Sequence, residues 1–185
     1  MRQIRFWAAL LLGLIAATAA AQSGITSERR FTLPDHGNLV MQVPRDWKDD
    51  FRQPPNRLPP TIALGPRSGR PFVILMTAVW PTTKMRPPQS REQLRAAVEQ
   101  GARGAKAQSV EKELRVVEFQ GRTGPGFYFS ATDRAPKPGE YRFVTQGIVR
   151  VGELTVTFTI LTNDGQEAVV THALDALKSA VQERV

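Results

Sequence analysis

The sequence predicts an α+β protein with a mostly antiparallel β-sheet and helices packed on its faces. Residues 141–162 contain two runs of alternating apolar and polar residues that meet at Gly152-Glu153, the pattern of a β-hairpin. Most other apolar runs are short and are separated by turn residues, as in further hairpin-linked strands. Two segments, which begin at residues 90 and 164, instead have the apolar spacing of helices. The resulting order, β-β-β-β-α-β-β-β-β-α, is typical of the α+β class.

The first 21 residues have the pattern of a secretory signal peptide. Arg2 and Arg5 precede an apolar stretch over residues 6–17, and small residues lead up to Ala21. We expect cleavage after Ala21 and a single domain over residues 22–185. An uncleaved anchor is the alternative, but the apolar run is shorter than the roughly 20 residues that a bilayer span needs. The sequence has no cysteine, so neither a lipid-anchored cysteine nor a disulfide is expected. These features predict a soluble, monomeric protein in the periplasm or outside the cell.

The N-terminal part of this domain predicts a hairpin. Residues 31–33 and 39–43 are apolar strands on either side of a turn-rich insert at 34–38, and a proline ends the second strand. Residues 25–30 are polar and are expected to form a lead-in. Trp47 follows the second strand at once, and we expect its indole to cover the edge of the core.

The next elements are two strands and the first helix. Residues 61–64 and 72–80 are apolar, and the length of the second run favours a central strand that is buried on both faces. Ser90 and Gln93 have the spacing of a capping box, which starts a helix with an apolar face of small residues. The opposite face of this helix carries a row that we expect to form ion pairs in solvent: Arg91, Arg95, Glu99 and Arg103.

Two strands, a loop, the main hairpin and the last helix complete the domain. Residues 114–119 and 126–132 are strands, and 133–140 is a polar loop. The second capping box, Asp164 to Glu167, predicts a helix that continues to the C-terminus. We expect this helix to cover the apolar face of the hairpin, in which the following pairs lie opposite each other: Val151 and Leu154, Val149 and Val156, Gly147 and Phe158, Thr145 and Ile160, Phe143 and Thr162. In this register the Phe158 ring covers the gap that Gly147 leaves.

The charge of the chain is unevenly distributed. The formal net charge is +8, and residues 45–106 contain 12 Lys and Arg but only 5 Asp and Glu. Such a basic region can bind an anionic lipid, lipopolysaccharide or an acidic protein surface. A merely soluble basic surface is the simpler interpretation. Nucleic acid is not expected as a partner of an exported protein.

The sequence contains no recognisable catalytic set. Cysteine is absent and there are two histidines, His36 in a turn and His172, which we expect to be exposed on the last helix. Serine hydrolase, zinc protease, phosphate-loop and dinucleotide motifs are absent. Asp133 and Glu140 share a loop, but their spacing matches no cation-binding motif. The sequence therefore predicts no enzyme, no cofactor and no metal site.

Three segments carry a resemblance to a known family. The apolar strand followed by Pro and Trp at 39–47 (LVMQVPRDW), the aromatic strand at 126–129 (GFYF) and the hairpin at 146–162 before a terminal helix resemble the PsbP-like family. The resemblance spans most of the domain. It implies an α-β-α sandwich without catalytic apparatus and a role in binding or assembling larger complexes.

These features favour an exported, non-enzymatic binding or assembly module of the cell envelope whose partner is an envelope protein or an anionic surface. The residues that we single out for partner binding are Arg142, Arg150, Trp47, Trp80 and His36. Two alternatives stay open. One is a small periplasmic hydrolase that uses His36 with a carboxylate, and the other is a basic surface for anionic lipid or lipopolysaccharide.

Overall fold

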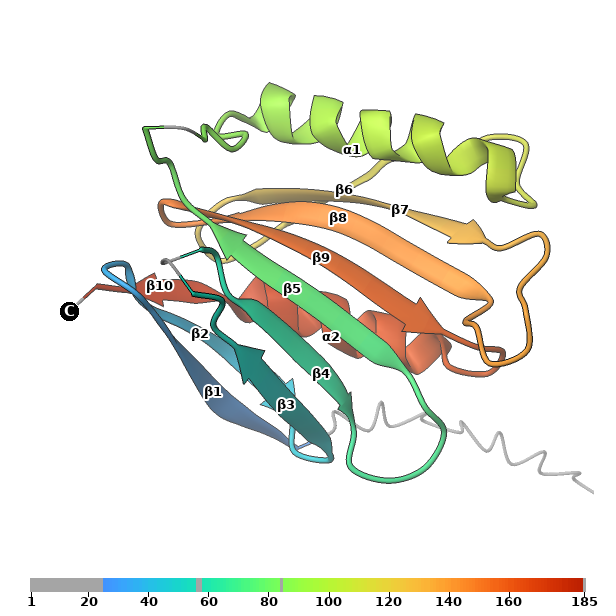
Figure 1. Ribbon diagram of the computed structural model, residues 1–185, viewed down its shortest axis with the longest axis horizontal. Coiled ribbons are helices and arrows are strands. Elements are labelled where there is room, and N and C mark those ends of the chain that lie inside the picture. Colours follow the sequence, from blue (N-terminus) through green and yellow to red (C-terminus); the bar gives the residue numbers. More distant parts are fainter. Residues whose placement is uncertain (1–24, 56–57, 84, 185) are drawn as a thin grey trace, which may run out of the picture.

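The computed structural model describes residues 25–55, 58–83 and 85–184, which form two β-sheets and two α-helices (Figure 1). The larger sheet has the order β3-β4-β5-β9-β8-β7-β6, and the smaller has the order β1-β2-β10. Every strand pairing is antiparallel. The elements are β1 (Thr26–Leu33), β2 (Gly37–Pro44), β3 (Trp47–Arg52), β4 (Thr61–Pro66), β5 (Val73–Val79), α1 (Arg91–Ala105), the short 3-10 helix η1 (Lys106–Gln108), β6 (Val117–Gln120), β7 (Pro125–Thr132), β8 (Phe143–Val151), β9 (Leu154–Thr162), α2 (Glu167–Ser179) and β10 (Val181–Glu183).

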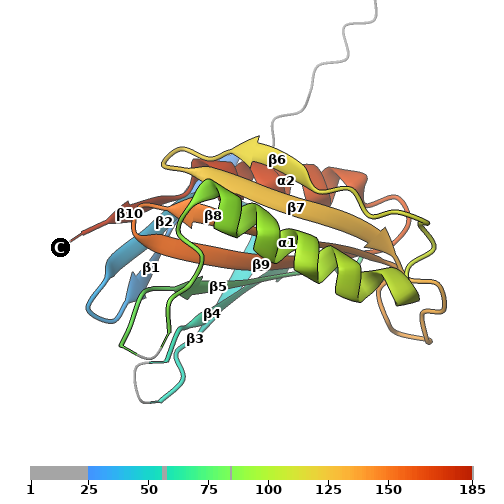
Figure 2. The same cartoon turned by 90° about the horizontal axis from the view of Figure 1, so that it is seen from above.

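The two helices lie on opposite faces of the seven-stranded sheet, as Figure 2 shows from above. Helix α1 packs on β7 and β8, where Leu94, Val98 and Ala102 bury against Phe127 and Phe129. Helix α2 and the three-stranded sheet cover the other face and enclose the larger part of the core. The α+β class and the layered arrangement that the sequence predicts are therefore confirmed. Within the described residues, no helix has both the length and the apolar character that crossing a bilayer requires.

The main hairpin has the register that the sequence predicts. Gly147 lies opposite Phe158 and Val149 lies opposite Val156, and the remaining predicted pairs also match. Gly152 has φ +62°, which a two-residue type II′ turn requires at its first central position. Strand β9 is the middle strand of the larger sheet, with β5 on one side and β8 on the other. The hairpin is thus the centre of the fold.

Three strands differ from the prediction. The polar residues 26–30, expected as a lead-in, are the first part of β1, because pairing with the apolar β2 holds them extended. Strand β3 is not predicted at all, because its charged residues occupy an exposed sheet edge where apolar alternation is unnecessary. Strand β10 replaces the predicted end of the last helix: Ala180 takes an extended conformation (ψ 135°), and the chain then pairs with β2.

Three further expectations are wrong in detail. Strand β5 is buried on one face and partly exposed on the other, because no helix covers its outer side. Strand β6 begins at Val117, three residues later than predicted. The second capping box does not form: Gln166 is the N-cap of α2, and its side chain bonds Asn163 and the carbonyls of residues 70 and 71 instead.

The first helix begins as predicted. Ser90 accepts a hydrogen bond from the backbone of Gln93, and the Gln93 side chain accepts one in return, so the capping box is complete. In the charged row, Arg95 pairs with Glu99 at 2.9 Å, as expected for an i,i+4 pair. Arg91 pairs instead with Glu118, which ties the start of α1 to β6.

Candidate functional site

On the α1 side, part of the larger sheet is covered by no helix of the described residues, and we call this area the uncovered face. Because α1 lies over β7 and β8, the strands β9, β5 and β4 are open toward the viewer in Figure 1. Side chains alternate along a strand, so every second residue contributes to this face. The floor consists of Thr77 opposite Thr157, Leu75 opposite Thr159, and Val73 opposite Leu161, with Ala63 beside Leu75. Leu75 is 38% exposed, which is unusual for a leucine in an interior strand.

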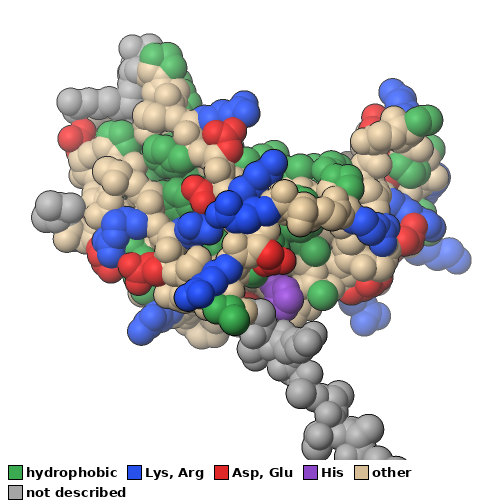
Figure 3. Space-filling view, turned by 90° about the horizontal axis from the view of Figure 1, so that it is seen from below, with side chains coloured by type: hydrophobic (Ala, Val, Ile, Leu, Met, Phe, Trp, Pro, Cys, Tyr) green, Lys and Arg blue, Asp and Glu red, His purple; other side chains and the backbone are tan. Residues whose placement is uncertain are grey.

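Three hollows make the uncovered face concave. A groove of about 190 Å³ runs between α1 and the sheet and is floored by Gly147, Thr157 and Thr159. A largely apolar hollow of about 350 Å³ lies over the starts of β3 and β5 and the end of β4, and Tyr141 forms one of its walls. A third, of about 840 Å³, lies under the loop at 133–141 and also includes Tyr141. Figure 3, seen from below, shows this face in profile along its upper margin, where two projecting parts of the surface have hydrophobic side chains between them.

The border of the uncovered face is charged on the side of β3. Lys48, Asp50 and Arg52 alternate along this edge strand, and Arg52 pairs with Asp50 at 2.8 Å. Edge strands with charged side chains resist pairing with strands of other molecules. A partner is therefore expected to approach the face of the sheet and not its β3 edge.

The two predicted arginines are both engaged within the molecule. Arg142 pairs with Asp164 at 3.1 Å, and its guanidinium lies 5.5 Å from the ring centre of Phe143. Arg150, expected to be exposed, is half-buried and donates hydrogen bonds to the carbonyls of Gly152 and Gln89. Arg150 thereby fastens the segment before α1 to the tip of the main hairpin.

The two predicted tryptophans are buried at opposite ends of the sheet. Trp47 is 3% exposed and packs on Phe72 with ring centres 5.0 Å apart, so its indole belongs to the core. Trp80 is 6% exposed and packs on His36, with ring centres 4.3 Å apart. His36 lies in none of the three hollows, and His172 is half-buried where exposure was expected.

The threonines of β9 divide into two kinds. Thr155 is completely buried, and its hydroxyl donates to the carbonyl of Pro88 at 2.7 Å. Thr157 and Thr159 are partly exposed and form part of the floor. The floor residues on β5 were missed, because a continuous apolar run gives no sign that one of its sides lacks a covering helix.

The loop carboxylates are used for local structure. Asp133 accepts a hydrogen bond from the backbone of Ala135, and Glu140 accepts one from the backbone of Lys137. Within residues 25–55, 58–83 and 85–184, no group of three or more metal-binding side chains comes together. The uncovered face can therefore contact a ligand through aliphatic groups and threonine hydroxyls in a concave surface.

Comparison with known proteins supports the fold. No protein-family model matches the chain, and no curated protein sequence does. The solution structure of cyanobacterial PsbP (CyanoP) from Synechocystis is similar with a TM-score of 0.51 and 14% identity, covering 90% of this chain and 99% of that one. A crystal structure from Bacteroides thetaiotaomicron is similar with a TM-score of 0.50 and 11% identity; the match covers 79% of this chain but 45% of that one, so the chain spans less than half of the Bacteroides protein. The chain has the PsbP-like fold.

Proposed function

We propose that the protein is a non-enzymatic binding module of the cell envelope that holds an amphipathic helix of a partner protein on the uncovered face. One observation carries this proposal: the larger sheet has seven strands, and α1 packs on two of them. An open sheet face with an exposed leucine in an interior strand is the kind of surface that a partner covers.

The dimensions of the uncovered face suit a helix. Neighbouring strands lie about 4.8 Å apart, so β4, β5 and β9 together span roughly 10–14 Å. A helix with its side chains is about 10–12 Å wide. The floor residues are short or of medium size. The same is true of Leu94, Val98 and Ala102, with which α1 packs on β7 and β8. A second helix beside α1 would therefore continue the existing layer.

The chemistry of the floor defines the partner. Val73, Leu75 and Leu161 supply aliphatic contacts, while Thr77, Thr157 and Thr159 add hydroxyls to the same surface. A matching helix presents apolar residues of medium size at i, i+3, i+4 and i+7 and polar residues on its outer side. Charged residues that flank the apolar side of this helix would meet the charged border on β3.

Other observations agree with a binding role. The predicted signal peptide, which lies outside the described residues, supports an envelope location, and the PsbP-like resemblance implies binding or assembly without catalysis. The hydrolase alternative required His36 in a pocket with a tryptophan and a carboxylate. His36 packs on Trp80, with the two rings tilted, and lies in none of the three hollows described above.

Site-specific photocrosslinking tests the proposal. A photoreactive residue at Leu75 is expected to give a discrete adduct with one envelope protein, whereas the same residue at the exposed Thr171 on α2 is expected to give none. Mass spectrometry of the adduct is expected to locate the crosslink in an amphipathic helix. The substitution Thr159→Arg, which fills the floor, should abolish the adduct. An adduct formed equally at both positions, or one in a segment without helical apolar spacing, contradicts the proposal.

A further inference from the structure

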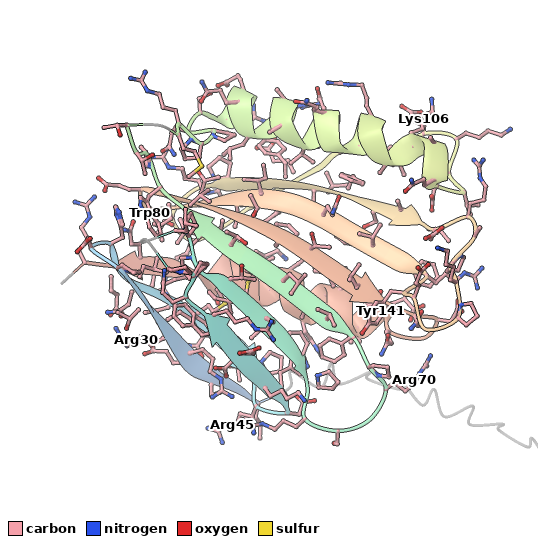
Figure 4. The ribbon with its side chains drawn as sticks, viewed as in Figure 1. Arg30, Arg45, Arg70, Trp80, Lys106 and Tyr141 are labelled. Atoms are coloured by element: carbon pink, nitrogen blue, oxygen red, sulfur yellow. The ribbon has the colours of Figure 1, made fainter. Side chains whose placement is uncertain are left out.

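Three arginines lie in two neighbouring loops at one end of the sheet, which we call the basic end; Arg45 and Arg67 are in contact, and Arg70 lies beside Gly165. Arg45 is in the turn between β2 and β3, and Arg67 and Arg70 are in the loop between β4 and β5. Figure 4 labels Arg45 and Arg70 along the lower side of the molecule, and Figure 3, seen from below, shows basic side chains interspersed with acidic ones on that side. All three residues are exposed.

Backbone contacts fix the relative positions of the two loops. The Arg67 N–H donates to the Asp46 carbonyl at 2.9 Å, and the Arg67 Nε donates to the Arg45 carbonyl at 3.2 Å. The Arg45 Nε donates to the carbonyl of Thr26 at 3.3 Å. Each of these two guanidinium groups is held at its Nε, and its terminal N–H groups make no hydrogen bond to another described residue.

Arg45, Arg67 and Arg70 have no ion-pair partner in the part of the chain that the structure describes. Many other arginines do, including Arg30 with Glu183 and Arg52 with Asp50. The carboxylates near the basic end are mostly engaged elsewhere: Asp49 pairs with Arg29 and Asp164 with Arg142, which leaves Asp46 in the turn itself. The basic end therefore has an excess of positive charge.

The chain enters the fold at this same end. Ile25 is 70% exposed, and its carbonyl accepts a hydrogen bond from the Arg45 N–H at 3.0 Å. Cleavage after Ala21, as the sequence predicts, would create an amino group three residues before Ile25 in the sequence. Without cleavage, the apolar residues 6–17 precede the same point.

We propose that the basic end contacts an anionic phospholipid bilayer. Guanidinium groups bind phosphate oxygens through paired N–H donors, and basic residues near an anionic bilayer add their attractions. The uncovered face begins beside these loops, since Pro66 and Pro71 line its apolar hollow, and it continues along β4 and β5 away from them. Membrane contact at the basic end therefore leaves the part of the face around Leu75 free. The basic run at 45–106 does not act as one surface, because Arg91, Arg95 and Arg103 lie on α1, away from these loops.

Cosedimentation with vesicles tests this proposal, using protein expressed from its full sequence and recovered from the exporting host. We expect binding to vesicles of phosphatidylglycerol and phosphatidylcholine, no binding to phosphatidylcholine alone, and loss of binding as salt rises. The triple substitution Arg45→Ser, Arg67→Ser, Arg70→Ser should weaken vesicle binding about a hundredfold. The matched control Arg86→Ser, Arg103→Ser, Arg115→Ser removes the same charge from exposed positions elsewhere and should weaken it less than tenfold.

Each other outcome overturns the proposal. Equal weakening in the two triple variants would assign vesicle binding to net charge alone. Equal binding to both kinds of vesicle would exclude recognition of anionic lipid. Tight binding of inorganic phosphate without vesicles, abolished by the first triple variant, would assign these arginines to a soluble anion. Crosslinking at Leu75 should be unchanged in the first triple variant, so a failure of this proposal is distinguishable from a failure of the proposed function.

Discussion

The ring of Phe158 occupies the space that Gly147 leaves on the neighbouring strand. The two residues lie directly opposite each other in the main hairpin. A Cβ atom at position 147 would lie 2.4 Å from Cζ of Phe158 and 2.3 Å from the carbonyl oxygen of Phe127. Only glycine fits between a buried ring and a backbone carbonyl at these distances. The contact fixes the pairing of β8 with β9, because a shift by one residue would place a side chain under the ring.

Gly147→Ala is expected to lower the free energy of unfolding by about 2–4 kcal/mol, because the rigid carbonyl of Phe127 cannot move aside as a flexible side chain can. Urea unfolding followed by circular dichroism measures this change. Gly104 in α1 is the matched control, since a Cβ there meets nothing within 4 Å. Gly104→Ala should raise the free energy of unfolding by about 0.5–1 kcal/mol. Similar small effects of the two substitutions would show that the hairpin accommodates a side chain at position 147.

Thr155→Val is expected to destabilise the protein by about 1–2 kcal/mol, because it removes the hydroxyl that donates to Pro88 and accepts from the Gln89 side chain. These contacts hold the segment before α1 against the sheet. Thr157→Val is the control on the same strand, since its hydroxyl lies 3.5 Å from its nearest acceptor, and its effect should stay within about 0.5 kcal/mol. Thermal unfolding of the two variants compares them directly. Equal losses would assign the effect to β-sheet propensity and not to the buried hydroxyl.

The sequence was sufficient where local patterns and the fold agree. The register at Gly147 and Phe158 follows from alternation and a glycine turn, and the cap at Ser90 follows from a four-residue motif. Both depend on neighbours in the sequence or across a single turn. The order of these locally predicted elements is enough to predict the α+β class.

The candidate site could not be predicted in the same way, since it depends on pairings between distant segments. Leu75 is exposed because β3 and β4 extend the sheet beyond the part that α1 covers. The sequence of β3 lacks the apolar alternation from which a strand is predicted. The alternation of the strand predicts an exposed Arg150, yet its guanidinium donates to the Gln89 carbonyl, 61 positions away in sequence. Likewise, Arg45 and Arg67 become neighbours only through the β3–β4 pairing.

Glu118 is expected to titrate below the usual range of a glutamate. Hydrogen bonds from the Arg91 guanidinium favour the charged form and lower the pKa of the Glu118 carboxyl from its ordinary value of 4.5. NMR titration of the side-chain carboxyl measures this pKa. In Arg91→Gln the pKa of Glu118 should move back toward its ordinary value, whereas Arg52→Gln, on the opposite edge of the sheet, should leave it unchanged. An unshifted pKa of Glu118 in the unsubstituted protein would show that the pair does not persist in solution.

Glu111 accepts hydrogen bonds at the end of β7, where β6 no longer pairs with this strand. Its carboxylate accepts hydrogen bonds from the backbone N–H of Thr132 at 3.0 Å and from the Thr132 hydroxyl at 2.6 Å. The adjoining Val110 N–H donates to the Thr132 carbonyl at 2.9 Å, so both backbone groups of Thr132 are paired although β6 does not reach them. Burial opposes ionisation of Glu111, but the bonds from Thr132 prevail and lower the pKa of its carboxyl below 4.5.

Glu111→Gln is therefore expected to cost about 1–2 kcal/mol of stability at neutral pH, because an amide is a weaker acceptor than a carboxylate. The folded-state pKa lies below the unfolded value of 4.5, so the carboxylate stabilises the fold fully above that pH and less as pH falls through the folded pKa. The difference between the variant and the unsubstituted protein should thus shrink in acid. Urea unfolding at pH 7 and at about pH 3 measures it, with Glu113→Gln, an exposed neighbour, as the control that changes stability at neither pH. A difference that stays constant between the two pH values would mean that the Glu111 carboxylate does not act through its charge.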